Sequence, residues 1–429
     1  MRRPLRHLLT AALIAAAAVL PVSVPAPAGA TAPPPAPVYP QWWADTPAKQ
    51  FAVLDYWTGD DFARWDFTIT QYPEGPYFTD TDRGRKWSAV DPQGNAAVTD
   101  TVGRVFARQT ATWQAVTRPS VAGDAVGAVR ETGAFKSWDA DAKAFVPADP
   151  VVPAERHFIE TQEIIKVENG QTTEYRHISW PTTCSANSVD SANGRTIVTA
   201  GHCTLVPVPM IAKAAGDKNG FAQDAIDLTN DKMIFVPGYR GDAPDLASQA
   251  PHGLWVVDKI YTTGQWSAFG QVGVSALNLF NFQYDVAMMT VVDPHRPGVR
   301  LADEVGAQHI AFRPIAAKET YAFGYPAAPS FGSGPVARYD GTSLVYAKNI
   351  AKKDWTMSLN YTLDANLSGG ASGGPMLQDF DPVAGIGTQV SLNSFNYSQF
   401  LGSLGNAQNI VGPSFTEDTR ILYNLVQMS

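Results

Sequence analysis

The stretch Gly370-Ala371-Ser372-Gly373-Gly374-Pro375 places a single serine between glycines. Glycines on both sides let the backbone turn sharply and approach a substrate without a side chain in the way. Such a turn can direct the N–H groups of Gly370 and Ser372 at one point, as an oxyanion hole requires. A flexible Gly/Ser loop is the alternative, but Pro375 and the apolar residues after it favour a fixed loop that enters a strand. We therefore expect Ser372 to be a nucleophile.

A second stretch, Thr199-Ala200-Gly201-His202-Cys203, ends the apolar run that starts at Thr196. A histidine at the end of a strand can act as a general base, although a lone histidine is more often a partly buried structural residue. Cys203 is able to bond back to Cys184, the only other cysteine of the chain. Closing that loop would contribute about 3 kcal/mol through the entropy of the unfolded chain.

A third stretch carries Asp285 within the run from Phe282 to Met289, which we interpret as an apolar strand. A carboxylate in such a strand is costly unless another group hydrogen-bonds to it. The Nδ1–H of a catalytic histidine is a suitable donor, because this bond fixes the tautomer and stabilises the imidazolium. The alternative is an aspartate that caps a turn before the strand.

The order of these residues along the chain separates the classes of serine hydrolase. An α/β-hydrolase needs a histidine after its serine, and the last histidine of this chain is His309, so that class is excluded. The subtilisin order would need strands that alternate with helices, and no such helical segments are evident. The order His202, Asp285, Ser372 is that of the chymotrypsin class.

Residues from about 180 to 395 resemble a secreted bacterial trypsin/chymotrypsin-like serine peptidase. The resemblance rests on TAGHC at 199–203, YDVA at 284–287, FGYP at 323–326 and GASGGP at 370–375, which stand in the order of that family. It implies two six-stranded antiparallel Greek-key barrels with the active site between them. It also implies that His202 is the general base, Asp285 its orienting partner and Ser372 the nucleophile. The pair Cys184–Cys203 matches the disulfide beside the catalytic histidine.

The chain also departs from the pattern of that family. Ala371 stands where pancreatic-type members have an aspartate that pairs with a newly freed N-terminus, so this form of activation is excluded. Asn366 stands six residues before the serine, where an aspartate confers preference for arginine and lysine. We expect Asn366 to lie at the substrate pocket, and we expect no strong preference for arginine or lysine. Asp364 is close enough that an error in the alignment with the family would restore this preference.

The composition agrees with an all-β protein and limits the possible partners. Charged residues make up only 17% of the chain, with 35 glycines and 32 prolines, which suits short strands joined by tight turns. The formal net charge of −8 gives no reason to expect a nucleic-acid partner. Two cysteines are too few for a four-thiolate metal site, and Asp139-x-Asp141 alone is a weak sign of calcium. We expect no cofactor and no metal.

The N-terminus has the features of an export signal. Residues 1–30 combine three early arginines, an apolar stretch and a small-residue cleavage site, Ala28-Gly29-Ala30. Their removal leaves a net charge of −11 and a secreted protein with no membrane-spanning segment. We expect residues 31–100 to form an N-terminal extension or pro-segment, removed near Arg83, Arg85 and Lys86, or to stay as a permanent module. Residues 101–429 would form the peptidase domain, with its core from about 157.

Short strands and one helix can be placed within this domain. The dipeptide Asn169-Gly170 stands between two alternating runs and predicts a β-hairpin. At the end of the chain, Ser414 with Glu417 makes a capping box before one apolar helical face. The sequence therefore predicts an all-β fold with a C-terminal helix. It predicts a monomeric, secreted serine endopeptidase that acts on proteins or peptides. The alternative is a catalytically silent secreted binding protein on the same scaffold.

Overall fold

The computed structural model describes residues 44–58, 82–131, 136–139, 144–147, 159–204, 227–269, 281–313, 316–328, 339–354, 360–397 and 409–429. The predicted signal peptide and the second aspartate of Asp139-x-Asp141 lie outside these residues. Within the described parts, no helix is both long and apolar enough to cross a membrane.

The first half of the domain is a closed barrel of six antiparallel strands. These are β2 (Val102–Pro119), β7 (Gln171–Ser188), β8 (Thr196–Thr199), β9 (Asp227–Pro237), β10 (Trp255–Thr262) and β11 (Ala287–Val292). The ring runs β2-β9-β10-β11-β8-β7 and closes where β7 pairs with β2. The consecutive strands β9, β10 and β11 lie side by side in the barrel. The strand before them in the chain, β8, pairs with β11 and not with β9, which makes the arrangement a Greek key. Apolar side chains such as Ile197, Phe235 and Met288 fill its interior.

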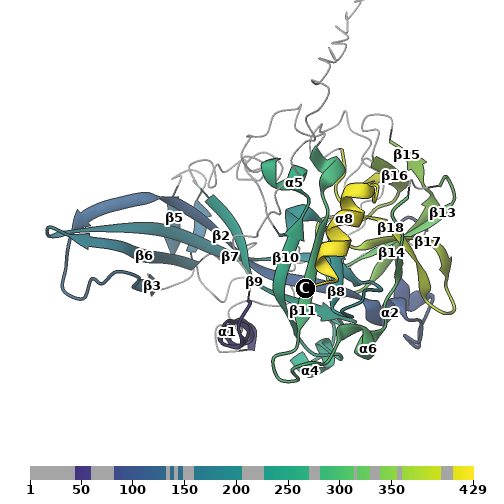
Figure 1. Ribbon diagram of the computed structural model, residues 1–429, viewed down its shortest axis with the longest axis horizontal. Coiled ribbons are helices and arrows are strands. Elements are labelled where there is room, and N and C mark those ends of the chain that lie inside the picture. Colours follow the sequence, from purple (N-terminus) through teal and green to yellow (C-terminus); the bar gives the residue numbers. More distant parts are fainter. Residues whose placement is uncertain are drawn as a thin grey trace, which may run out of the picture. The chain divides into compact units, whose positions relative to one another are not determined.

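Two strands of this barrel continue well beyond it. β2 and β7 each have 18 residues and pair over most of their length, and Figure 1 shows them with β6 as a ribbon at the left. β6 (Ile159–Glu168) and β3 (Val129–Glu131) extend this sheet, and β4 (Lys136–Asp139) pairs with β5 (Ala144–Pro147). The predicted hairpin at Asn169-Gly170 is confirmed, since both residues have positive φ, 50° and 72°, and join β6 to β7. The extension of β2 to Pro119, beyond the barrel, was not predicted from the sequence.

The second half is built from two sheets that face each other. The larger has the order β1-β14-β13-β17-β18-β12 and the smaller the order β15-β16-β19. Its strands are β1 (Arg85–Lys86), β12 (His309–Ile310), β13 (Glu319–Gly324), β14 (Val345–Ile350), β15 (Lys352–Lys353), β16 (Asn360–Asp364), β17 (Pro375–Asp381), β18 (Ile386–Leu392) and β19 (Asn409–Pro413). Ser394 and Phe395, just after β18, bond through their N–H groups to Val411 of β19 and so join the two sheets. The resemblance implied a second barrel. Here the second barrel is closed by such hydrogen bonds between its sheets, and its described strands do not pair all the way round as they do in the first barrel.

The described parts of the N-terminal extension belong to the packed core. Trp57 of α1 (Pro47–Thr58) is buried against Phe106 of the first barrel. β1 pairs with β14, and Trp87 of η2 (Trp87–Ala89) is buried among rings of the second barrel that include Phe323. α2 (Val98–Thr101) leads directly into β2. A single buried cluster therefore contains side chains of the extension and of both barrels.

The C-terminal helix is present as predicted, but its cap is different. α8 (Glu417–Val426) packs with Leu422 and Val426 on the core of the first barrel, beside β11 (Figure 1). Thr416, not Ser414, is the N-cap, and it forms a capping box with Thr419. The reason is that Phe415 is still bonded to Val390 of β18 through its N–H, so the helix cannot begin earlier. The remaining helices are short: η3 (Gly201–Cys203), α4 (Leu246–Gln249), α5 (Gly264–Phe269) and α6 (Leu301–Val305).

Candidate active site

His202 lies in η3, directly after the buried strand β8. Gly201 permits this turn because a Cβ there would lie only 2.7 Å from the indole nitrogen of Trp266. Cys203, the next residue, forms a disulfide with Cys184 of β7, with a Cα–Cα distance of 6.1 Å. The backbone on both sides of the imidazole is therefore fixed to the first barrel.

Asp285 is fully buried and accepts three hydrogen bonds. The N–H of His202 donates to Oδ1 at 2.7 Å, and the His202 ring is joined to Oδ2 through Nδ1 at 2.8 Å. The third donor is the hydroxyl of Ser394, 2.5 Å from Oδ2. Three donors satisfy a buried carboxylate that would otherwise be too costly to keep charged.

The position of Asp285 differs from the predicted one. The strand begins only at Ala287, so Asp285 stands before β11 and not within it. A helical turn at residues 281–284 precedes it, and the N–H of Val286 bonds to the carbonyl of Tyr284. This turn points the carboxylate at His202 without taking a side-chain position from the sheet. Asp285 therefore stands at a turn before the strand, as the alternative had it, but its carboxylate binds His202 and Ser394 rather than capping that turn.

The loop that carries Ser372 packs against the turn that carries His202. Gly373, at φ 84°, lies so close to β8 that a Cβ would stand 2.1 Å from the hydroxyl of Thr199. The carbonyl of Ser372 accepts a hydrogen bond of 2.7 Å from the N–H of Ser185, and Sγ of Cys203 lies 3.8 Å from the same oxygen. The structure therefore brings the three predicted residues to one place, where the two barrels meet.

One contact expected of a Ser–His pair is missing. Among the described residues, no hydrogen bond joins the half-buried Ser372 hydroxyl to the ring of His202. Such bonds are often long or poorly aligned in enzymes without substrate and tighten when substrate binds. The ring nitrogen that would take the proton is Nε2, because Nδ1 is engaged by Asp285.

The backbone of the serine loop leaves two donors unused. Gly370 has φ 94°, and a Cβ there would lie 2.6 Å from the carbonyl of Tyr325, so only glycine fits. Neither the N–H of Gly370 nor that of Ser372 has an acceptor among the described residues. These are the two groups predicted to form the oxyanion hole.

The region expected to contain the substrate pocket shows an unforeseen ion pair. The N–H of Asn366 donates to the carbonyl of Arg83 at 2.5 Å. The guanidinium of Arg83 binds the carboxylate of Asp364 at 2.7 Å. If the alignment with the family were shifted, Asp364 would be the pocket residue that binds a basic substrate side chain. Its carboxylate is, however, already bound by Arg83 of the same chain.

Three important polar residues were not found from the sequence. Ser394 donates to Asp285 across 109 residues of sequence, and Asn393 and Ser185 bind the serine loop. The available signals were local: Asn393-Ser394 is a polar pair at the end of an apolar strand, and Ser185 follows a cysteine. Neither pattern identifies a partner that lies far away in the sequence.

One group of possible metal ligands occurs among the described residues, Cys184, His202 and Cys203. Both sulfurs are bonded to each other, so they are not available as thiolate ligands. This group therefore does not form a metal site.

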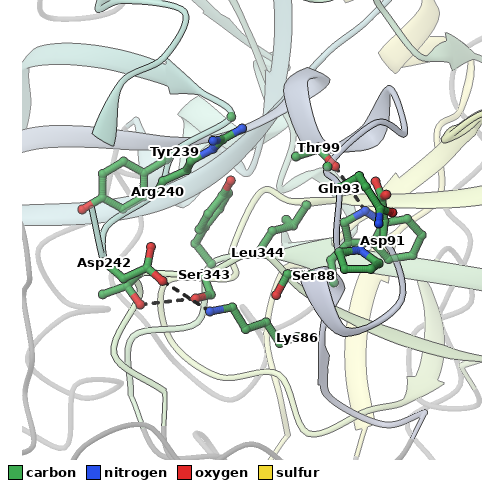
Figure 2. Close-up of a pocket in the computed structure, with 16 residues that line it drawn as sticks. Lys86, Ser88, Asp91, Gln93, Thr99, Tyr239, Arg240, Asp242, Ser343 and Leu344 are labelled. Carbon is green, nitrogen blue, oxygen red and sulfur yellow. Dashed lines mark hydrogen bonds and ion pairs between the residues drawn. The ribbon is translucent and has the colours of Figure 1, made fainter. Parts of the chain in front are cut away.

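A separate cavity of about 290 Å³ lies between the N-terminal extension and the barrels (Figure 2). Its lining includes Lys86 and Asp242, an ion pair at 3.5 Å, together with Tyr325. Burial raises the pKa of the Tyr325 phenol above its ordinary value. None of His202, Asp285 and Ser372 lines this cavity, so it is distinct from the candidate active site.

Comparison with known proteins identifies similar solved structures. The protease Anisep from Arthrobacter nicotinovorans is 28% identical, covering 58% of this chain and 90% of that chain, with a TM-score of 0.42. The thermostable serine protease AL20 from an extremophilic microorganism is 21% identical, covering 78% and 99%, with a TM-score of 0.44. A Glu endopeptidase is 17% identical, covering 58% and 86%, with a TM-score of 0.37. No family model matches the sequence, and the search of curated proteins found no match.

The architecture itself identifies the fold. A closed six-stranded antiparallel barrel, a second β half, and a disulfide beside a histidine at their junction make a two-barrel structure. The chain has the fold of the trypsin/chymotrypsin-like serine peptidases.

Proposed function

We propose that this protein is a secreted serine endopeptidase in which His202, Asp285 and Ser372 form the catalytic triad. The observation that carries the proposal is the buried carboxylate of Asp285, which holds His202 by its N–H and its Nδ1. A carboxylate with no solvent exposure that is aligned on an imidazole beside a glycine-flanked serine is the arrangement that acyl transfer requires.

The reaction would run through an acyl-enzyme intermediate. Oγ of Ser372 attacks the carbonyl carbon of the peptide bond while Nε2 of His202 takes the hydroxyl proton. The oxyanion of the tetrahedral intermediate accepts hydrogen bonds from the N–H groups of Gly370 and Ser372. His202 then gives its proton to the leaving amine, and a water molecule activated by the same histidine hydrolyses the ester. Asp285 stays ionised throughout and stabilises the imidazolium.

The test is covalent labelling of Ser372. A fluorescent organophosphonate reacts with an activated serine, so we expect one adduct, located at Ser372 by mass spectrometry, together with peptide hydrolysis. Ser372→Ala is the matched control and should show neither. The missing Ser372–His202 hydrogen bond favours a silent binding protein as the second candidate. An unlabelled, inactive wild-type protein would select that candidate.

For the substrate, we propose that a polypeptide binds with its side chain near Asn366. Strong preference for arginine or lysine is not expected, because Asn366 is uncharged and the carboxylate of Asp364 is bound by Arg83. Cleavage of a peptide library, read by mass spectrometry, would test this. Cleavage confined to arginine and lysine would contradict it.

We propose export after removal of residues 1–30, and that the described parts of the extension remain in the mature protein. Arg83 and the strand β1, at which removal was predicted from the sequence, are bound to Asp364 and to β14. Removing Trp87 would open the cluster that both barrels share. N-terminal sequencing of the active secreted protein tests both points. A mature N-terminus beyond residue 44 would contradict the permanence of this segment. One between residues 84 and 87, from cleavage after Arg83, Arg85 or Lys86, would restore the pro-segment.

A further inference from the structure

The peptide planes of the serine loop are all held from outside the loop. Each of four consecutive carbonyl oxygens, from Gly369 to Ser372, accepts a hydrogen bond from another part of the chain. The donors are the N–H of Ala327 to Gly369 (2.6 Å), the hydroxyl of Ser185 to Gly370 (2.9 Å), the side-chain amide of Asn393 to Ala371 (3.1 Å) and the N–H of Ser185 to Ser372 (2.7 Å).

These bonds decide where the two unused N–H groups point. In a trans peptide the C=O of one residue and the N–H of the next point in opposite directions, and the described chain has no cis bond. The carbonyl of Ala371 accepts from Asn393 and also from the N–H of Gly374, at 3.0 Å, and these bonds turn the N–H of Ser372 away from it. In the same way the bond to the carbonyl of Gly369 directs the N–H of Gly370.

We propose that the side chains of Asn393 and Ser185 are positioning residues that keep the oxyanion hole in its competent form. Relatives with an aspartate before the serine can use an ion pair with a new N-terminus for this purpose, and Ala371 removes that possibility. This inference rests on the proposed function, because it assigns a task to the N–H groups of Gly370 and Ser372. Its consequence is that the hole is assembled by folding and needs no freed N-terminus.

Asn393 has the burial and the bonds that this role needs. Its side chain is fully buried, and its amide nitrogen donates to the carbonyls of Ala371 and Phe323, the latter at 2.7 Å. Its backbone adds two bonds to the same loop, from its N–H to Gly374 and from the N–H of Gly373 to its carbonyl. Within the described residues the amide oxygen has no partner, which costs free energy that a leucine would avoid.

Ser185 links the loop to the neighbouring segment of the second barrel. Its hydroxyl donates to the carbonyl of Gly370 and accepts from the N–H of Tyr325, both at 2.9 Å. Tyr325 stands two residues before Ala327, whose N–H holds the carbonyl of Gly369. One buried hydroxyl therefore fixes one peptide plane directly and supports the segment that fixes another.

The first experiment compares Asn393→Leu with Gln378→Leu. Gln378 is a matched control because it is also fully buried and donates through its amide nitrogen to two acceptors, Ala316 and Thr320. Its amide oxygen likewise has no partner in the described part of the chain. We expect Asn393→Leu to lower kcat about 100-fold with KM within about twofold, because the loss falls on the transition state. Affinity for a peptide boronic acid, whose boronate oxygen occupies the oxyanion hole, should fall by a similar factor. Gln378→Leu should change the melting temperature but neither kcat nor inhibitor affinity.

The second experiment compares Ser185→Ala with Ser188→Ala. Ser188 lies on the same strand, is equally buried, and its hydroxyl donates to the carbonyl of Gly306, away from the serine loop. We expect about a tenfold loss of kcat for Ser185→Ala only. Ser185→Ala is the smaller substitution, so it tests the inference if Asn393→Leu does not fold. If the wild type hydrolyses peptides and Ser185→Ala and every folded Asn393 variant keep its kcat, the inference is overturned. If the wild type neither turns over substrate nor labels at Ser372, the proposed function fails instead.

Discussion

Among the residues that the structure describes, three histidine–aspartate pairs have nearly the same length but lie in different surroundings. His202 and Asp285 are 2.8 Å apart, His252 and Asp100 are 2.8 Å apart, and His309 and Asp190 are 2.6 Å apart. The aspartate side chain is 0% exposed in the first pair, 34% in the second and 56% in the third. Distance alone therefore does not single out the pair that we propose to be catalytic.

The difference lies in what else holds the aspartate. Asp285 is fully buried and has two further donors, from the backbone of His202 and the hydroxyl of Ser394. In such a low-dielectric place, fixed hydrogen bonds are strong and the imidazole is held in one orientation. Asp190 is exposed, so solvent and salt screen its pair with His309. A buried and fully bonded aspartate beside a nucleophile loop is what makes the first pair a candidate for catalysis.

The largest expected effect comes from removing the groups that react. Ser372→Ala and His202→Ala should each abolish peptide hydrolysis and leave the melting temperature close to the wild-type value, because the residues of the proposed triad act as one unit. His252→Ala is the matched control from the second pair and should retain activity. We would measure initial rates on a fluorogenic peptide. Full activity in either of the first two variants would remove that residue from the triad.

The next largest effect is expected when Asp285 and Asp100, which both lie 2.8 Å from a histidine, are each replaced by asparagine. Asp285→Asn should lower kcat on the order of 10⁴-fold, because the asparagine favours the wrong tautomer of His202. Asp100→Asn should change kcat by less than about twofold, since Asp100 is about one third exposed and bonds to His252 rather than to His202. Steady-state kinetics of both variants give the comparison. Similar losses in the two variants would mean that burial of Asp285 is not what matters.

The sequence predicted the parts of this site that local chemistry dictates. Gly370 and Gly373 were expected to allow a sharp turn, and their positive φ angles of 94° and 84° show why no other residue fits there. The disulfide Cys184–Cys203 and the Asn169-Gly170 turn also follow from neighbours in sequence or from having only two cysteines.

The parts that could not be predicted depend on contacts between distant segments. Ser394 reaches Asp285 only because β18 ends beside β19 and turns back toward the first barrel. The Ser414–Glu417 pattern was a valid cap by itself, yet Phe415 is held by Val390 and moves the helix start to Glu417. The pairing of Arg83 with Asp364 likewise joins residues 281 positions apart. The secondary-structure propensities of neighbouring residues do not predict pairings between residues so far apart in the sequence.

A smaller effect tests the additional donors on Asp285. Ser394→Ala removes one of three hydrogen bonds to the carboxylate but leaves its charge and both bonds to His202. Because hydrogen bonds to charged groups contribute about 1.5–3 kcal/mol, we expect a fall in kcat of about tenfold, with KM little changed. Ser188→Ala is the control for removal of a buried hydroxyl. An unchanged kcat would show that the two bonds to His202 suffice to orient the aspartate.

The smallest effect is expected at the exposed pair. His309 stands on β12 and its ring bonds to the carboxylate of Asp190, whose carbonyl also accepts the hydroxyl of Tyr423. Because both side chains of the pair are more than half exposed, the ion pair should contribute less than about 1 kcal/mol, and less still in high salt. His309→Gln should therefore shift the free energy of unfolding by no more than this and leave peptide hydrolysis unchanged. Urea denaturation at low and high salt measures the first, and the fluorogenic peptide assay the second. A loss of several kcal/mol, or any fall in kcat comparable with that of Ser394→Ala, would show that exposure does not separate the structural pair from the catalytic one.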